Sequence, residues 1–535
     1  MSFHSWRRAA RKSLVTTCAA ALICGGVPVS AQNQLPALGD SVSENFDVGA
    51  ERKLGDEIMR EIRRDPDYLD DPVLLDYLQS IWQPLVETAR KRGEISADTS
   101  QRYAWEPFLV RDRSVNAFAL PGGYVGVHLG LIAMTESADE LASVLAHELS
   151  HVTQRHIARG IENSKRQSLL SAAAMIAGVL AASRSSRGDA ANAVITGGQA
   201  AAIQGELNFS RDMEREADRI GFGLLTGAGF APSGMSAMFE KLDQASRLND
   251  SGSYPYLRSH PLTTERIGAA RARLATAPRV APVRLLEHAM AQSRARVLVD
   301  TKTQALQRWQ NLDQDAKLRG SGAASVADAI AAAHSSALAS TLLHDWERAD
   351  AALAQAAQLL RSANPDDGGR AESALAMLVA QSQLERGKPA AASAALAGLS
   401  ASYANRRSVM LMAAQIAMAG RSQPTPDDMQ LRAQAGRLQT WVAEHPQDAM
   451  VWLTLSQVWN RLGHPLRSIR AEAESRFAIG DLTGAIDRLR AGQTLIRAGG
   501  KVDFIEASVV DSRLRDIEAQ RRSELAEREQ RRGGG

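Results

Sequence analysis

The chain has 535 residues, 44% hydrophobic and 23% charged, with a formal net charge of +3. This length allows roughly two to four domains with buried cores, and the composition is typical of a globular protein. Four positive charges, on Arg7, Arg8, Arg11 and Lys12, lie at the N-terminus with no acidic residue before residue 32. The remainder therefore carries a net charge of −1, which gives no indication of nucleic-acid binding.

Residues 1–31 have the pattern of a secretory signal peptide. The four basic residues precede the apolar stretch SLVTTCAAALICGGVPV, and VSAQ then predicts cleavage after Ala31. The stretch is too short for a membrane-spanning helix. Both cysteines, Cys18 and Cys24, lie in this segment. The mature chain would have no thiol, which excludes cysteine ligands and nucleophiles and suits a bacterial periplasmic protein.

The next part of the chain predicts helix, then a small sheet. Residues 32–50 are polar and expected to be extended, and residues 51–95 are expected to be helical. The stretch FLVRDRSVNAFALPGGYVGVHLGLI is rich in β-branched and apolar residues. Its Pro121–Gly123 predicts a turn between two short strands.

A helix is predicted from Ser137, with Glu140 completing a capping box, to about Gly160. Within it, HELSH places His147 and His151 four residues apart on one helix face, where both can bind one cation. Glu148 lies to one side, within reach of a metal-bound water. His156 and His128 are expected to pack nearby or to support the ligands.

The segment FSRDMEREADRIG supplies a candidate third ligand, Glu214. Asp218, one helical turn later, would accept a hydrogen bond from a ligand histidine and fix its tautomer. Glu216 is expected to point elsewhere and to be solvated. The alternative is a buried helix with hydrogen-bonded histidines and no metal.

Residues 168–183 form a nearly continuous apolar run of about 16 residues, shorter than the roughly 20 needed to cross a bilayer. We expect a buried helix or hairpin near the metal site. Shallow contact with a membrane is the alternative.

From about residue 285 onward, strand signals are absent and helical segments are joined by short breaks. Breaks near Asp345, Gly387, Gly420, Gly463 and Gly480 suggest paired helices with irregular repeats of about 34–43 residues. The pattern resembles tetratricopeptide units, with Trp452, Leu455 and Leu489 in the seam; a general α-helical bundle is the alternative. The predicted domains are a signal peptide (1–31), a domain with the candidate metal site (32–285), a repeat domain (286–525) and a disordered tail (526–535).

HExxH followed by ExxAD and preceded by NAFALPGG resembles the zinc peptidases that include HtpX and the CAAX prenyl endopeptidases. Those members are embedded in membranes, whereas this chain resembles periplasmic members with tetratricopeptide repeats. The resemblance implies a mostly α fold: a zincin-type metalloprotease domain with a small β-sheet, followed by an α-helical solenoid. It also implies one Zn²⁺ per chain, misfolded or stalled outer-membrane β-barrel proteins as substrates, and docking to their assembly machinery.

Carried over to this sequence, the resemblance makes His147, His151 and Glu214 the zinc ligands and Glu148 the general base. It also implies that His260, in RSHPL, can occupy the metal's open position and hold the enzyme inactive. The alternative for His260 is an ordinary loop histidine before a proline.

Three further side chains are candidate donors to the oxyanion of the transition state: Arg211, Tyr254 and Tyr256. Residues 122–129 are expected to form an edge strand that pairs with an extended substrate. This pairing would allow cleavage of unfolded chains with little sequence preference.

Two other classes of function stay open. The repeats could make this a chaperone or scaffold whose zinc site is latent or secondary. A purely structural zinc site is disfavoured, because such a site has no use for Glu148. No nucleic-acid partner and no stable transmembrane anchor are expected.

Overall fold

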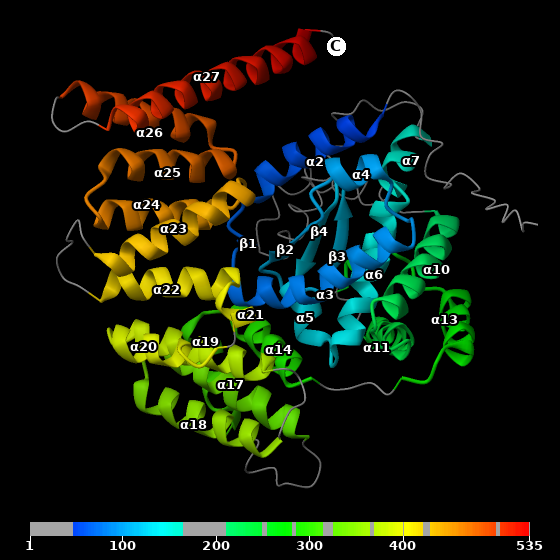
Figure 1. Cartoon of the computed structure of the whole chain (residues 1–535). Helices are drawn as coiled ribbons and strands as arrows, with labels where there is room; N and C mark the ends of the chain where they lie inside the picture. Colours follow the sequence, from blue (N-terminus) through cyan, green and yellow to red (C-terminus); the bar gives the residue numbers. More distant parts are fainter. Residues whose placement is uncertain are drawn as a thin grey trace, which may run out of the picture. The chain divides into compact units, whose positions relative to one another are not determined.

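The computed structural model describes most of the chain after residue 45. The described ranges are 46–163, 210–248, 254–280, 285–313, 325–363, 369–399, 401–420, 428–498 and 503–533. The predicted signal peptide (1–31) and the apolar run (168–183) lie outside these residues. The structure has a small sheet with helices around it, followed by a long helical region (Figure 1). This arrangement confirms the predicted mostly α fold class.

The sheet has four strands in the order β1-β2-β4-β3: β1 (Tyr68–Leu69), β2 (Glu106–Val110), β3 (Ala117–Leu120) and β4 (Tyr124–His128). Strands β2 and β4 are parallel, and the other two pairs are antiparallel. The prediction that 122–129 form an edge strand is wrong, because β4 lies between β2 and β3. The edge strand on this side is β3.

The turn predicted at Pro121–Gly123 is confirmed as the connection of the β3–β4 hairpin. Gly122 and Gly123 have φ of 75° and 88°, in the left-handed region that favours glycine. A Cβ on Gly123 would lie 2.9 Å from Cβ of Tyr103. Both the backbone conformation and the lack of space for a Cβ therefore require glycine at position 123.

The helices around the sheet belong mainly to one core. They are α2 (Val48–Ile62), α3 (Pro72–Lys91), α4 (Ala97–Arg102), α5 (Leu129–Met134), α6 (Ala138–Thr153), α7 (His156–Asn163), α10 (Arg211–Gly227), α11 (Ser233–Leu248), α12 (Tyr256–Ser259) and α13 (Thr264–Thr276). Helix α6 packs against α3, α10, α11 and β3. This position makes α6 the central helix of the domain, and its residues Ala138 to Val152 are almost all buried.

Helix α6 begins as the sequence predicted but ends earlier. The Ser137 side chain accepts a hydrogen bond from the Glu140 backbone N–H at 3.2 Å. The Glu140 carboxylate instead accepts from the Glu136 N–H, so the capping box is only half formed. The helix stops at Thr153, and Arg155 has φ of 51°, so the predicted continuation to Gly160 is replaced by the separate helix α7.

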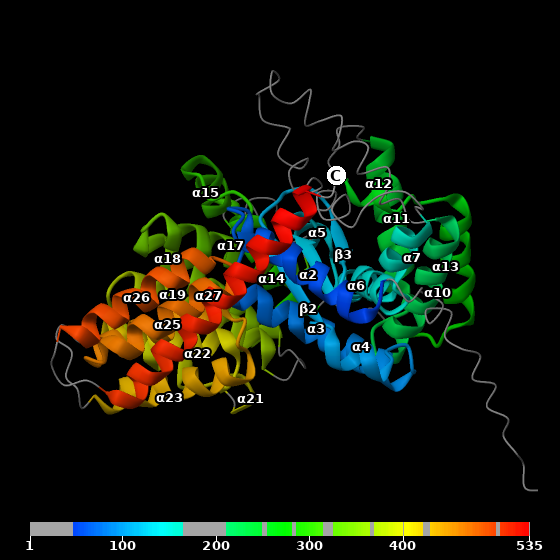
Figure 2. The ribbon, with the colours of Figure 1, turned by 90° about the horizontal axis from the view of Figure 1, so that it is seen from above.

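The rest of the described chain is helical, as predicted. The helices are α14 (Leu286–Leu298), α15 (Thr303–Gln310), α17 (Val326–Leu342), α18 (Trp346–Ala363), α19 (Arg370–Glu385), α20 (Pro389–Leu396), α21 (Ala401–Ala404), α22 (Arg407–Ala419), α23 (Met429–Glu444), α24 (Ala449–Arg461), α25 (Pro465–Ala478), α26 (Leu482–Arg497) and α27 (Phe504–Gly533). Most pack against the helix before and the helix after them (Figures 1 and 2).

Three of the predicted breaks carry a left-handed glycine after a helix: Gly387, Gly463 and Gly480. The predicted seam residues Trp452, Leu455 and Leu489 are buried. Helix α27 continues to Gly533 and so extends into the range for which a disordered tail was predicted. The charged sequence there consists largely of good helix formers such as Glu, Arg, Ala and Leu.

Helix α14 belongs to two hydrophobic cores at once. Ala291 and Ala295 pack in the core around α3 and α6, whereas Leu286 and Met290 pack in the core of α17–α19. The peptidase-like part and the following helices therefore share an element.

A half-buried arginine, Arg407, provides a second connection. The Arg407 guanidinium binds both carboxylate oxygens of Asp70, which follows β1, at 2.7 Å, and both oxygens of Asp448 at 2.7 and 2.8 Å. Asp448 also caps the N-terminus of α24. One arginine thus joins the sheet region to two helices of the helical region.

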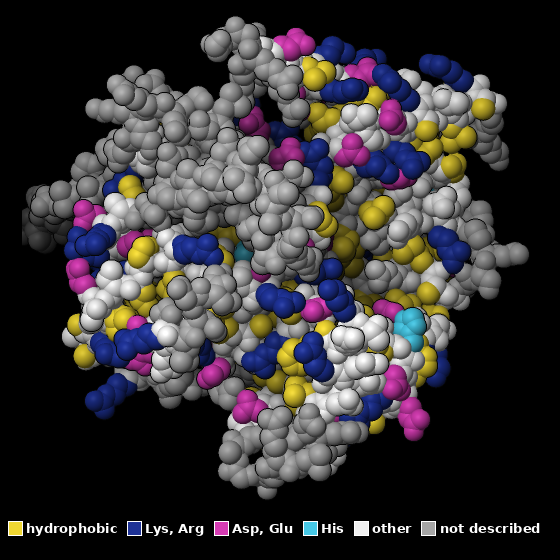
Figure 3. Space-filling model, turned by 180° about the vertical axis from the view of Figure 1, so that it is seen from behind, with side chains coloured by type: hydrophobic (Ala, Val, Ile, Leu, Met, Phe, Trp, Pro, Cys, Tyr) yellow, Lys and Arg dark blue, Asp and Glu magenta, His cyan; other side chains and the backbone are white. Residues whose placement is uncertain are grey.

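Charged side chains of both signs are intermixed on the face drawn in Figure 3. Ion pairs also join different elements, such as the pair between Arg513 of α27 and Glu474 of α25. Among the described helices, none combines the length and apolar character needed to span a bilayer.

We predict that Arg407→Leu lowers the free energy of unfolding by about 1.5–3 kcal/mol, because it leaves two half-buried carboxylates without a counter-charge. Chemical denaturation of the full chain measures this loss. Arg102→Ala removes an exposed pair with Asp98 and should cost less than about 1 kcal/mol. Equal losses in the two variants would show that the Arg407 connection contributes little.

Candidate metal centre

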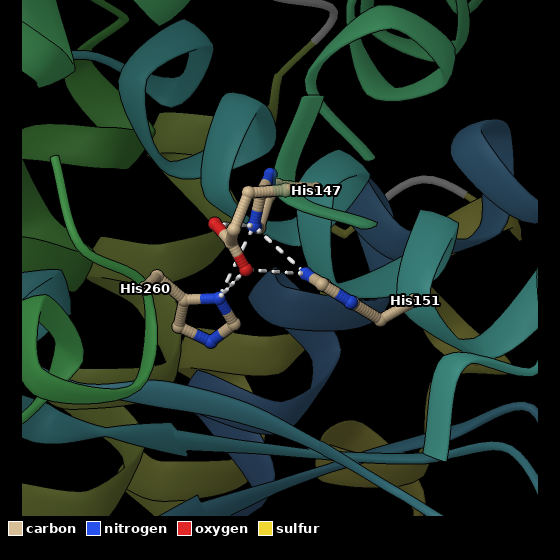
Figure 4. A group of neighbouring side chains, drawn as sticks. His147, His151 and His260 are labelled. Carbon is tan, nitrogen blue, oxygen red and sulfur yellow. Dashed lines mark hydrogen bonds and ion pairs between the residues drawn. The ribbon is translucent and has the colours of Figure 1, made fainter. Parts of the chain in front are cut away.

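Four buried side chains from three segments converge on one point (Figure 4). His147 and His151 come from α6, Glu214 from the first turn of α10, and His260 from the residue after α12. Each offers one nitrogen or oxygen atom, and these four atoms all lie within 4.8 Å of one another. The structure therefore brings together the three predicted ligands and His260, the possible fourth ligand.

The spacing of the donor atoms suits a tetrahedral metal. The Nε2 atoms of His147 and His151 are 3.0 Å apart, and Nδ1 of His260 lies 3.3 Å from Nε2 of His147. Oε1 of Glu214 is 3.0 Å from Nδ1 of His260 and 3.4 Å from Nε2 of His151. Donors bound to zinc at 2.0–2.1 Å are about 3.3 Å apart in a tetrahedron.

Local sequence explains how α10 approaches α6 closely enough. A Cβ on Gly221 would lie 3.1 Å from the Ala146 carbonyl oxygen and 3.2 Å from Cα of His147. Glycine at this position lets the two helix backbones pack closely. Glu214, two turns earlier on α10, can then reach the imidazoles of α6.

Asp218 lies where the sequence expected it, beside a histidine of the pair. Its Oδ1 is 3.1 Å from Nδ1 of His147, and Arg266 binds both of its oxygens at 2.7 and 2.8 Å. Burial raises the pKa of Asp218, but Arg266 and His147 outweigh this effect and lower it. An ionised Asp218 holds the imidazole proton on Nδ1 and leaves Nε2 as a lone-pair donor.

The electrostatics of the cluster favour a cation. Burial lowers the pKa of His147, but hydrogen bonds to Asp218 and Glu214 raise it to about 9. Burial is the main reason that the pKa of His151 lies well below its usual value. Glu214 is also buried, yet His260 and the other histidines hold its pKa below the usual range. The pocket thus retains an anion that attracts positive charge.

Glu148 is fully buried beside the cluster. Its Oε2 accepts a hydrogen bond from the Ala119 N–H on β3 at 3.0 Å, and its Oε1 is 3.5 Å from Nε2 of His260. Burial raises the pKa of Glu148, and the nearby His260 and His147 lower it only in part. A carboxylate whose pKa is raised is a better proton acceptor, as a general base requires.

His260 is fixed by its surroundings. The Tyr256 ring lies 4.7 Å from the His260 ring, centroid to centroid. Arg266 donates to the Pro261 carbonyl oxygen at 2.9 Å and lies 2.7 Å from Oε2 of Glu214. Sequence reasoning missed Arg266; its position one helical turn after the HPL segment was the available signal.

The three candidate oxyanion donors are placed differently. Tyr256 is buried next to His147 and His260, and burial raises its pKa far above the usual value, so that its hydroxyl stays protonated. Tyr254 is half-buried, and Arg211 is exposed at the first residue of α10, outside the cluster. Only Tyr256 lies against the cluster.

The expectation that Glu216 is solvated is wrong. Its Oε2 lies 3.0 Å from Nε2 of His156 and 2.9 Å from Nη1 of Arg159. The break after α6 turns His156 back toward His151. The periodicity of an uninterrupted helix gave no sign of this contact.

Three imidazoles, a carboxylate and an adjacent buried glutamate define a metallopeptidase-type centre. In comparison with known proteins, residues 77–274 match the model of Peptidase family M48.

The chain is similar to proteins named beta-barrel assembly-enhancing protease. It is 35% identical to that of Escherichia coli K12 over 269 residues (50% of this chain, 53% of the relative) and 36% identical to that of Yersinia pestis over 243 residues (45% and 48%). Mitochondrial metalloendopeptidase OMA1 of Schizosaccharomyces pombe is 35% identical over 163 residues (30% and 44%). The chain spans about half the length of the curated relatives it matches.

We predict that chelator-treated protein takes up about one zinc ion per chain and melts at a higher temperature with zinc. Stabilisation reaches about 4 kcal/mol when free zinc exceeds Kd a thousandfold. Elemental analysis and thermal melting measure both effects. His151→Asn should lose most of each, whereas His128→Asn, at a buried histidine outside the cluster, should retain both. Equal zinc uptake by the two variants would contradict the assignment.

Proposed function

We propose that the chain is a zinc-dependent endopeptidase in which His147, His151 and Glu214 hold the metal and Glu148 is the general base. The observation that carries this proposal is the position of Glu148, which is buried beside the donor cluster and anchored to the β3 backbone. A structural metal site would need no such carboxylate.

When bound, zinc would polarise the scissile carbonyl and lower the pKa of the attacking water to about 7. Glu148 takes a proton from that water and passes it to the leaving amine. Asp218 holds the proton of His147 on Nδ1, away from the metal. Tyr256, with its protonated hydroxyl, is the best placed of the three candidate oxyanion donors.

An extended substrate would pair with β3 rather than with residues 122–129. Strand β3 is at the edge of the sheet, and its residue Ala119 contacts the proposed base directly. Backbone pairing at a sheet edge reads extended conformation more than side-chain identity. Unfolded or incompletely folded chains are therefore the substrates that this arrangement suits.

His260 gives the resting site a means of self-inhibition. Its Nδ1 completes a set of four protein donors, and a zinc site with four protein ligands is closed in the manner of structural sites. Catalysis requires an open position, so His260 would have to leave before substrate binds.

The cellular setting is also part of the proposal. The sequence pattern of residues 1–31 favours export to the periplasm, and the relatives' name links them to β-barrel assembly. We propose misfolded or stalled outer-membrane β-barrel proteins as substrates and their assembly machinery as a partner. The tetratricopeptide-like helices, stacked in sequence order, would contact these proteins.

A chaperone or scaffold activity is the second candidate. It is favoured by the size of the helical region, whose α14 is shared with the peptidase core. Such an activity would not need Glu148.

We predict that Glu148→Gln lowers cleavage of an unfolded outer-membrane β-barrel protein by about 10²–10⁴-fold, because it removes the proton acceptor. The variant should still bind zinc, since Glu148 lies outside the donor set. Cleavage is followed by gel electrophoresis, and assembly of the same client is measured in parallel. Loss of cleavage with assembly preserved would show two separable activities, whereas undiminished cleavage would contradict the proposed mechanism.

His260→Ala should raise the rate of cleavage by about tenfold or more, because it removes the donor that closes the site. Rates are compared at equal zinc content. His128→Ala, at another buried histidine, is the matched control and should leave the rate near that of the wild type. A His260→Ala variant with normal zinc and no gain in rate would argue against self-inhibition.

A further inference from the structure

A line of polar contacts runs outward from His151, away from the proposed metal. Nδ1 of His151 is 2.8 Å from Nδ1 of His156, and Nε2 of His156 is 3.0 Å from Oε2 of Glu216. Arg159 donates to the same oxygen at 2.9 Å. Both ring nitrogens of His156 are thus engaged, which a histidine that only fills space would not need.

The break between α6 and α7 creates this line. On an uninterrupted helix, residues five apart point about 140° away from each other, so His156 would face away from His151. Instead Arg155 adopts φ of 51°, unusual for a residue other than glycine. Its guanidinium holds this conformation through Glu51 Oε2 at 2.9 Å and the Phe46 carbonyl oxygen at 3.0 Å.

Proton positions follow from the geometry and from the proposed function, on which this inference rests. If Nε2 of His151 binds the metal, the single proton of the neutral ring is on Nδ1 and is donated to Nδ1 of His156. His156 must then carry its own proton on Nε2, where Glu216 accepts it. The positive charge of Arg159 keeps the Glu216 carboxylate ionised, so that it can accept this hydrogen bond.

We propose that His156 is a positioning residue for the metal: it fixes the tautomer and ring orientation of His151, supported by Glu216 and Arg159. The two ligand histidines of α6 are then anchored separately by α10. His147 is held directly by Asp218, and His151 is held by Glu216 through His156.

If His156 has this role, two substitutions at position 156 should change zinc affinity to different extents. His156→Ala removes the acceptor of the His151 proton and should weaken zinc binding about 10–100-fold. His156→Asn keeps an acceptor, because its Oδ1 takes the position of the imidazole Nδ1, and should stay within about threefold of the wild type.

The test is competition with a chromophoric zinc chelator, using the full chain in a Glu148→Gln background so that hydrolysis plays no part. His334→Ala is the matched control: His334 is a buried histidine on α17 bonded to Ser293, and its loss should leave zinc affinity unchanged. Equal affinity of the Ala and Asn variants at 156, whether weakened or not, would overturn the proposal. Absence of zinc binding by the parent protein would instead refute the proposed function.

A second readout separates positioning from packing. With ¹⁵N-labelled histidine, the zinc-loaded parent should show a protected His151 Nδ1–H resonance in the NMR spectrum. That signal should persist in His156→Asn and be lost or shifted upfield in His156→Ala. An identical signal in both variants would show that His156 does not accept this proton.

Discussion

The centre depends on one constraint: several donor atoms face one another in a buried space. His147 and His151 bring their Nε2 atoms to 3.0 Å, and Glu214 and His260 lie beside them. Asp218 Oδ1 lies 3.1 Å from Nδ1 of His147, and Nδ1 of His156 lies 2.8 Å from Nδ1 of His151, on the sides of the two rings that face away from the cluster. Inward-facing lone pairs repel unless a cation separates them. Close packing of α10 on α6, permitted by Gly221, keeps these atoms together.

The helical region contacts Thr135, the residue that ends α5 shortly before α6 begins. On α14, Nε2–H of His288 donates to the Thr135 carbonyl oxygen at 3.0 Å, and the Gln292 amide donates to the same oxygen. Nδ1 of His288 is hydrogen-bonded with the Tyr77 hydroxyl. Thr135 lies two residues before Ser137, which caps α6. The first helix of the helical region therefore contacts the end of α5, close to the connection that leads into α6.

Local sequence determined much of the site and little of its surroundings. Helical spacing paired His147 with His151 and Glu214 with Asp218, since residues four apart share a face, but it did not show that the two pairs would meet. His260 came only from the resemblance, because nothing in its own segment predicts which helix it meets. The break at Arg155, the edge position of β3, and the contacts of Glu216 and Arg266 depend on segments far apart in the sequence. Those contacts form only when the chain is folded, so periodicity could not reveal them.

The most direct measurement is X-ray absorption at the zinc edge of the zinc-loaded protein. The account predicts three imidazole nitrogens and one carboxylate oxygen at about 2.0–2.1 Å, with one imidazole lost in His260→Ala. A first shell made mostly of oxygen, or one that does not change when Glu214 or His151 is replaced, would contradict the central claim that these side chains surround a single metal ion.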